Sequence, residues 1–247
     1  PLEDPGSEGI AAVLTSCLQP DEQNRRVIAD MIAAAHDLVQ GHDPASMQED
    51  APQLARTAVE LDRAHPGDPS ILAALLMNRV HLRPGESLFL GAGTMHAYLH
   101  GTGIEIMASS DNVLRGGLTS KHIDVPALLA HADLTATCVQ PECPRQLPGG
   151  LQHYRTPFPE FTLWRLGECV ETDLPATGLG RILLVLDGRM SLTTSAGVTS
   201  NDTGAEVTQM RAGQAVWISA GQQVHVTGSA VGFLAAPGVG QEFPDEL

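Results

Sequence analysis

The sequence predicts a mixed α and β protein, in which a helical domain is followed by β-barrel domains. Three observations support this prediction. Apolar residues change from helical spacing to alternation near residue 78, a Pro- and Gly-rich segment divides the β region, and one glycine–histidine pattern occurs twice. We expect a helical domain at 1–78, β structure at 79–139, a linker at 140–160 and a second barrel at 161–247.

The N-terminal third has the apolar spacing of amphipathic helices. One run ends at Gly41, a residue type that commonly terminates helices, and a second run spans 47–65. Asp68 then stands where it can cap a short helix with Pro69 at its first position. The first run is made of Val27, Ile28, Met31, Ile32, Ala35, Leu38 and Val39. We therefore expect three helices in this domain.

The remainder of the chain favours short strands joined by tight turns. We expect a strand at 87–90, and a Gly-Thr-Gly turn at 101–103 between strands at 96–100 and 104–107. Residues 123–131 have the pattern of a short helix. The second barrel is expected to use strands at 161–168, 181–186, 190–194, 206–210, 215–218, 224–227 and 231–235.

The repeated pattern joins two glycine turns to a histidine. The first copy runs from Gly85 through Gly91 and Gly93 to His96, and the second from Gly213 through Gly221 to His225. Each copy reads as a strand, a glycine turn and a second strand that begins at the histidine. Two jelly-roll barrels in tandem would produce such a repeat.

Charge and composition exclude several classes of partner. The formal net charge is -15, which repels nucleic acids and anionic membranes. We find neither an apolar run near 18 residues nor a signal peptide, so we expect no membrane partner. The four cysteines, Cys17, Cys138, Cys143 and Cys169, favour free thiols in a reducing cytoplasm over a metal site or disulfides.

The first copy of the repeat resembles the second conserved motif of cupins. Gly91 stands in that motif's Pro position and His100 in its Asn position, while its histidine, a metal ligand in cupins, is His96. A strand on a barrel wall points alternate side chains inward, and imidazole is a common zinc ligand. The alternative is that His96 is a hydrogen-bonded core histidine.

Residues 84–125 resemble the signature segment of type I mannose-6-phosphate isomerase (phosphomannose isomerase), a family of cupin enzymes. The stretch 156–163 is similar to that family's entry into its last barrel, and the helical region suits its inserted helical domain. The matching residues are His96, Ala97, Tyr98, Glu105, 107–113, Arg115, 117–119 and Lys121. The resemblance implies interconversion of mannose 6-phosphate and fructose 6-phosphate by metal-assisted proton transfer through a cis-enediol.

The family binds one metal, usually zinc, through a Gln, two His and a Glu. His96 matches the last of these ligands. The others belong to an earlier barrel segment with a Gln-x-His motif, which we do not find here. We therefore expect the other zinc ligands to lie outside this chain, the first barrel to be incomplete, and the activity of this polypeptide alone to be uncertain.

The resemblance also implies roles in binding a phosphorylated hexose. Arg115 matches the family's catalytic arginine, and a guanidinium suits an enediolate because it is always charged. Asp111 would either transfer the proton or orient Arg115. Lys121 would help to hold the anionic substrate, and Tyr98 and Glu105 would line the pocket.

Two other classes of function remain open. The chain could be a non-catalytic sugar-phosphate-binding cupin module, or a scaffold cupin pair used for assembly. Residues 175–181 contain no metal-ligand type upstream of His225, so we expect the second barrel to be non-catalytic. The oligomeric state is not predicted.

Overall fold

The chain divides into two compact units in a computed structural model. One unit contains Pro1–His81, Leu90–Gly103 and Ser110–Gln140, and the other contains Leu82–Phe89, Ile104–Ser109 and Pro141–Leu247. The structure describes residues 7–41, 51–110, 112–136, 139–194 and 206–238.

The first unit contains the helices. They are α1 (Ser7–Leu18), α2 (Glu22–Gly41), α3 (Ala51–Ala64), α4 (Ser70–Leu75) and α5 (Val125–His131). Ile28, Ile32 and Ala35 of α2 pack against α3 and against Ile71 of α4. Their spacing of three and four residues places them on one face of the helix, as the sequence predicts. Among the described residues, no helix is long and apolar enough to cross a bilayer.

Helix ends agree with the predicted signals. Helix α2 ends at Gly41, and α3 lies inside the predicted run at 47–65, of which 47–50 are outside the described residues. The Oδ1 atom of Asp68 accepts the amide of Ser70, the first residue of α4, at 2.8 Å. Pro69 occupies the N-cap position of α4 rather than the first helical position that the sequence predicts. Helix α1 has no separate counterpart among the three helices that the sequence predicts.

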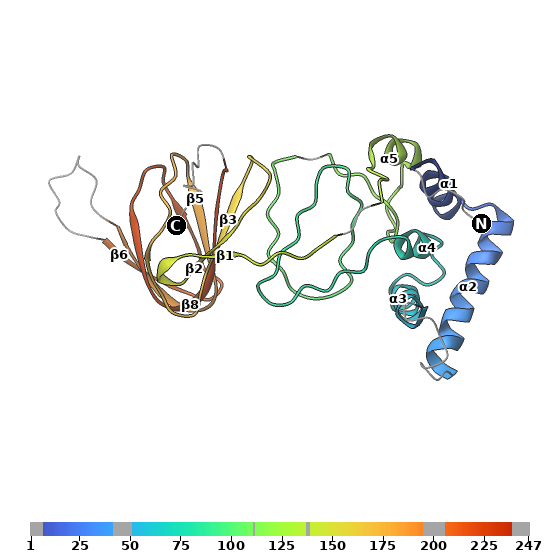
Figure 1. Cartoon of the computed structure of the whole chain (residues 1–247), viewed down its shortest axis with the longest axis horizontal. Helices are drawn as coiled ribbons and strands as arrows, with labels where there is room; N and C mark the ends of the chain where they lie inside the picture. The colour runs from blue at the N-terminus through green and yellow to red at the C-terminus, as the bar shows by residue number, and fades with distance from the viewer. Residues whose placement is uncertain (1–6, 42–50, 111, 137–138, 195–205, 239–247) are drawn as a thin grey trace. The chain divides into compact units, whose positions relative to one another are not determined.

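The strands predicted at 87–90, 96–100 and 104–107 do not form. Among the described residues from 78 to 124, the only pairing is an isolated bridge between Ser87 and Glu142. Figure 1 draws this stretch as a loop without strand arrows. A strand needs a neighbour whose amides and carbonyls continue the ladder, and the described chain supplies none here. Local turns persist, such as the 3.2 Å bond from the amide of Thr94 to the carbonyl of Gly91.

The second unit is an antiparallel sheet of eight strands. Its order is β1-β2-β3-β8-β5-β6, with β4 also pairing with β8 and β7 with β5. The strands are β1 (Arg145–Gln146), β2 (Leu151–Tyr154), β3 (Thr162–Leu166), β4 (Val170–Asp173), β5 (Arg181–Thr194), β6 (Glu206–Arg211), β7 (Ala215–Ile218) and β8 (Val224–Ala236). The expected linker at 140–160 therefore contributes β1 and β2 to the sheet.

Two long strands organise this sheet. Strands β5 and β8 pair along their whole length, with one irregularity between Val185 and Asp187. On its other edge, β5 pairs first with β7 and then with β6, while β8 pairs first with β4 and then with β3. The strands predicted separately at 181–186 and 190–194 are thus one strand, and so are those at 224–227 and 231–235.

A single apolar core fills the folded sheet. Leu183 and Leu234 come from one half of the long strands and Met190 and Val226 from the other, yet all belong to one buried cluster. Trp164 joins the cluster from β3, where it pairs with Leu234. Two glycines permit the close approach between β5 and β8. A Cβ on Gly188 would lie 2.2 Å from the carbonyl oxygen of Ser229, and one on Gly228 2.5 Å from that of Arg189.

Candidate functional site

His96 is held by its own backbone segment. Its Nδ1 atom lies 3.0 Å from the carbonyl oxygen of Thr94, and its ring meets Tyr98 edge-on with centroids 6.1 Å apart. A carbonyl only accepts hydrogen bonds, so Nδ1 carries the hydrogen. In the neutral ring the lone pair is then on Nε2, which is the arrangement typical of metal-binding histidines. His96 is exposed among the described residues of this chain.

Arg115 and Lys121 lie at the two ends of a tight turn. Both side chains are exposed. Between them, Gly117 and Leu118 adopt positive φ angles of 128° and 51°. The amide of Leu118 donates to Oγ of Ser70 at the start of α4, at 2.7 Å. The helical unit therefore holds the backbone between the two cations, a connection that the apolar pattern does not reveal.

A second contact joins the signature segment to α3. One Glu60 carboxylate oxygen lies 2.8 Å from Nδ1 of His100, and the other 3.3 Å from the guanidinium of Arg79. The hydrogen bond from His100 and the charge of Arg79 hold the pKa of the Glu60 carboxyl below its ordinary value, against a smaller upward effect of burial. His100, the residue in the cupin Asn position, thus contacts the helices.

For the other predicted site residues, the structure gives less information about their positions. Asp111 lies outside the described residues. Glu105 is exposed and belongs to the other unit. Across the part of the chain that the structure describes, no three His, Cys, Asp or Glu side chains gather as a metal site. Of the predicted site residues, the structure brings His96 and Tyr98 together.

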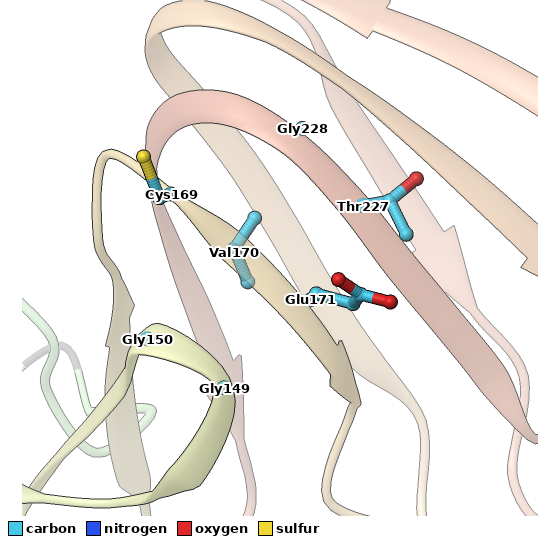
Figure 2. Close-up of a pocket in the computed structure, with 7 residues that line it drawn as sticks. All are labelled: Gly149, Gly150, Cys169, Val170, Glu171, Thr227 and Gly228. Carbon is cyan, nitrogen blue, oxygen red and sulfur yellow. The ribbon is translucent and has the colours of Figure 1, made fainter.

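A shallow depression lies on the sheet unit. Two glycines with positive φ lie against the chain at β4: a Cβ on Gly149 would be 2.3 Å from the carbonyl oxygen of Glu171, and one on Gly150 2.4 Å from that of Cys169, the residue before β4. Figure 2 shows the lining residues, which are Gly149, Gly150, Cys169, Val170, Glu171, Thr227 and Gly228. None of them is cationic and Glu171 is anionic, so this depression does not suit a phosphorylated sugar.

His225 lies near this depression, on β8. It is partly exposed, and its Nδ1 atom lies 2.8 Å from Oδ1 of Asp173, its cross-strand neighbour on β4. A cross-strand pair of this kind stabilises the sheet edge. Among the described residues it is not part of a group of three metal-ligand side chains.

Comparisons with known proteins bear on the resemblance found in the signature segment. No profile of a known protein family matches the chain. The mannose-6-phosphate isomerase of Salmonella typhimurium is 40% identical over 131 residues, covering 53% of this chain and 30% of that protein. The mannose-6-phosphate isomerase of Bos taurus is 30% identical over 227 residues, covering 88% of this chain and 52% of that protein. The chain belongs to the mannose-6-phosphate isomerase family.

Solved structures agree with this membership. A variant of phosphomannose isomerase from Salmonella typhimurium matches with a TM-score of 0.76 and 26% identity, covering 96% of this chain and 56% of that one. Other structures of that mannose-6-phosphate isomerase carry alanine in place of one histidine, one glutamate and one arginine. The chain spans about half or less of the length of the curated relatives named here.

Proposed function

We propose that this chain acts as part of an enzyme that interconverts mannose 6-phosphate and fructose 6-phosphate. One observation carries the proposal. In the Salmonella enzyme, an alanine-substituted glutamate and arginine lie nine and nineteen residues after an alanine-substituted histidine. His96, Glu105 and Arg115 have that same spacing, inside the segment that resembles the family signature.

His96 is proposed as one ligand of a single divalent metal, which we take to be zinc. The Nδ1–H bond to Thr94 supports this role, because it fixes the ring and leaves Nε2 for coordination. When bound, the metal would act as a Lewis acid on the sugar oxygens. The other ligands are proposed to lie outside this chain.

The proposed roles of the charged residues come from the resemblance to the family. Arg115 would stabilise the negative charge of the enediolate, and Lys121 would bind the phosphorylated hexose. Asp111 would transfer the proton between C1 and C2 or orient Arg115. Tyr98 and Glu105 would line the pocket. The exposure of Arg115 and Lys121 supports these roles, because both side chains are accessible to a substrate.

The segment at 79–139 is proposed to complete a cupin barrel together with strands outside this chain. Its strand-like stretches have no ladder among the described residues, and Tyr98, Met107 and Val113 each leave more than half of their side chains exposed. Apolar side chains next to unpaired backbone are typical of a surface that another strand covers. The sheet at 161–247 would be the second, non-catalytic cupin barrel, and the enzyme would work in the cytoplasm.

The direct test is conversion of mannose 6-phosphate to fructose 6-phosphate by the purified chain. The assay is run with added zinc, with a chelator, and with the N-terminal segment of the Salmonella relative. We expect turnover only when that segment and zinc are both present. His96→Ala should abolish this turnover, whereas His225→Ala should preserve it.

Other outcomes separate the alternatives. Chelator-sensitive turnover by the chain alone would contradict the incomplete barrel and the external ligands. If the segment restores nothing while the chain still binds mannose 6-phosphate in the presence of chelator, the chain is a non-catalytic binding module.

A further inference from the structure

The hydroxyl of Ser70 forms the centre of a short hydrogen-bond relay. It donates to Oδ1 of Asp68 at 2.6 Å and accepts the amide of Leu118 at 2.7 Å. A serine hydroxyl has one hydrogen, and Leu118 offers only a donor, so both directions of the relay are fixed. Ser70 is 3% exposed, so water does not easily replace either partner.

The turn that Ser70 contacts is sterically unusual. Leu118 has a φ of 51°, which a branched, bulky residue rarely adopts. Gly117 before it has a φ of 128°, and a Cβ there would lie 2.5 Å from Cβ of Ser70. The side chain of Leu118 packs against the helical core. Strained backbone persists only where its surroundings over-determine it, and such positions cluster at functional sites.

The position of this turn in the sequence links it to the proposed site. Arg115 precedes Gly117 by two residues, and Lys121 follows Leu118 by three. Both cations have long, flexible side chains, so their backbone must be held if the two charges are to meet one substrate at a defined separation.

We propose that Ser70, oriented by Asp68, is a positioning residue that holds the Gly117–Leu118 turn and thereby sets the placement of Arg115 and Lys121. The functional half of this inference rests on the proposed isomerase function. The structural half stands on the hydrogen bonds, the positive φ angles and the contact between Gly117 and Ser70.

The test compares Ser70→Ala with two controls. Asp68→Asn keeps an oxygen that can accept from Ser70, and Ser16→Ala removes a hydroxyl that bonds Ala12 within its own helix. Amide hydrogen exchange is measured across the chain, and isomerase kinetics are measured with zinc and the added N-terminal segment. We expect Ser70→Ala to speed exchange at Leu118 by about tenfold and to lower kcat/KM by a similar factor. Asp68→Asn and Ser16→Ala should leave both values near those of the parent.

Each outcome decides the proposal. Faster exchange confined to Leu118 and its neighbours, together with the lower kcat/KM, supports it, whereas faster exchange with an unchanged kcat/KM overturns the positioning of Arg115 and Lys121. An unchanged Asp68→Asn variant shows that the relay, rather than the carboxylate charge, is required. Unchanged exchange at Leu118, or equal acceleration throughout the helical unit, overturns it. If the parent shows no turnover while the local exchange effect appears, the positioning of the turn is supported and the proposed isomerase function fails.

Discussion

The two copies of the glycine–histidine pattern share their turns and differ in the pairing of their strands. Gly85 and Gly213 have φ angles of 91° and 82°, and Gly93 and Gly221 have 81° and 71°. In each case the glycine occupies the left-handed region that other residues avoid. The two copies therefore agree at the level of single-residue conformation.

The agreement extends to hydrogen bonds around the first turn. The side chain of Glu86 accepts the amide of Arg83 at 2.8 Å, and the side chain of Gln214 accepts the amide of Arg211 at 2.9 Å. A main-chain hydrogen bond also closes each turn. The amide of Glu86 donates to the carbonyl of Arg83 at 3.0 Å, and the amide of Gln214 donates to the carbonyl of Arg211 at 3.1 Å. Both turns are closed by contacts among residues no more than three positions apart, so they are local structures.

The difference appears in the strands. In the second copy, β7 and β8 both pair with β5, and Ile218, Val224 and Val226 are buried in its core. In the first copy, pairing within the described chain is limited to the bridge from Ser87 to Glu142. The comparison shows that a turn is a local property, whereas a strand depends on a partner distant in sequence.

The largest predicted effect concerns the close approach of β5 to β8, the strand that begins within the second copy. Gly188 and Gly213 have nearly the same φ, 79° and 82°, but a Cβ on Gly188 would meet backbone at 2.2 Å while Gly213 has open space. We expect Gly188→Ala to cost about 4 kcal/mol of unfolding free energy, from strain and overpacking together. Gly213→Ala should cost about 1 kcal/mol. Denaturant titration measures both free energies of unfolding. Equal costs would show that the steric contact of the added Cβ with the backbone of β8 does not contribute.

The next effect is a pH dependence of the sheet unit. Burial, with smaller effects of Arg155 and Arg145, lowers the pKa of His153 to about 4. The unfolded chain therefore binds a proton near the ordinary pKa of 6.5, while the folded chain binds it only near 4. The contribution of neutral His153 to the free energy of unfolding is therefore fully present above a pH of about 6.5. It falls by about 3 kcal/mol as the pH is lowered to about 4, because the unfolded chain gains a proton that the folded chain does not bind.

Variants of this unit separate His153 from other histidines. Unfolding free energies between about pH 4 and pH 7.5 should have a much smaller slope in His153→Gln. The partly exposed His225 provides a control, and His225→Gln should retain the slope of the parent. A slope that persists in His153→Gln would assign the effect to other groups.

A buried arginine supports the turn of the second copy. Arg181 is fully buried, burial lowers its pKa, and its guanidinium donates to the carbonyl oxygens of Pro175 and Gln222. Arg181→Met should lower the free energy of unfolding by about 2 kcal/mol, because two carbonyls lose a charged hydrogen-bond donor. Removing the buried charge offsets part of this loss. Thermal unfolding measures this cost. Arg189→Met, at an exposed position on the same strand, is the control and should change little.

The smallest stability effect is expected in the unpaired copy. His96 is exposed and bonds only to its own segment among the contacts described, so His96→Ala should change the unfolding free energy by less than about 0.5 kcal/mol. Calorimetry tests this value alongside the expected loss of turnover. A large destabilisation would mean that His96 is a structural residue.

The sequence predicted the helices and turns better than the extent of the strands. Apolar alternation breaks at Asp187 and Gly188, so β5 was expected as two strands, but the ladder continues through this point because main-chain bonding is independent of side-chain polarity. The predicted strands at 206–210 and 215–218 agree with β6 and β7. The short strands β1 and β2 were missed because Pro and Gly dominate their surroundings.

In the candidate site too, some residues could be predicted from the sequence and others could not. His96, Arg115 and Lys121 were found because the signature segment resembles a family, and their roles stay predictions. Ser70 and Glu60 were missed because a serine after Asp68 reads as an ordinary helix start, and Glu60 as a solvated charge on α3. Only the folded chain shows that each contacts the signature segment.

The glycine turns of both copies, the helical faces and the family of this protein could be predicted from the sequence alone. These depend on the φ preference of single residues, on neighbours three or four positions away, and on a run of matching residues. The tertiary structure decided which extended segments became strands, which glycines must stay glycine, and which helix holds the turn between Arg115 and Lys121. Those outcomes depend on groups that are far apart in the sequence, such as Ser70 and Leu118, whose contact exists only once the helical core has formed.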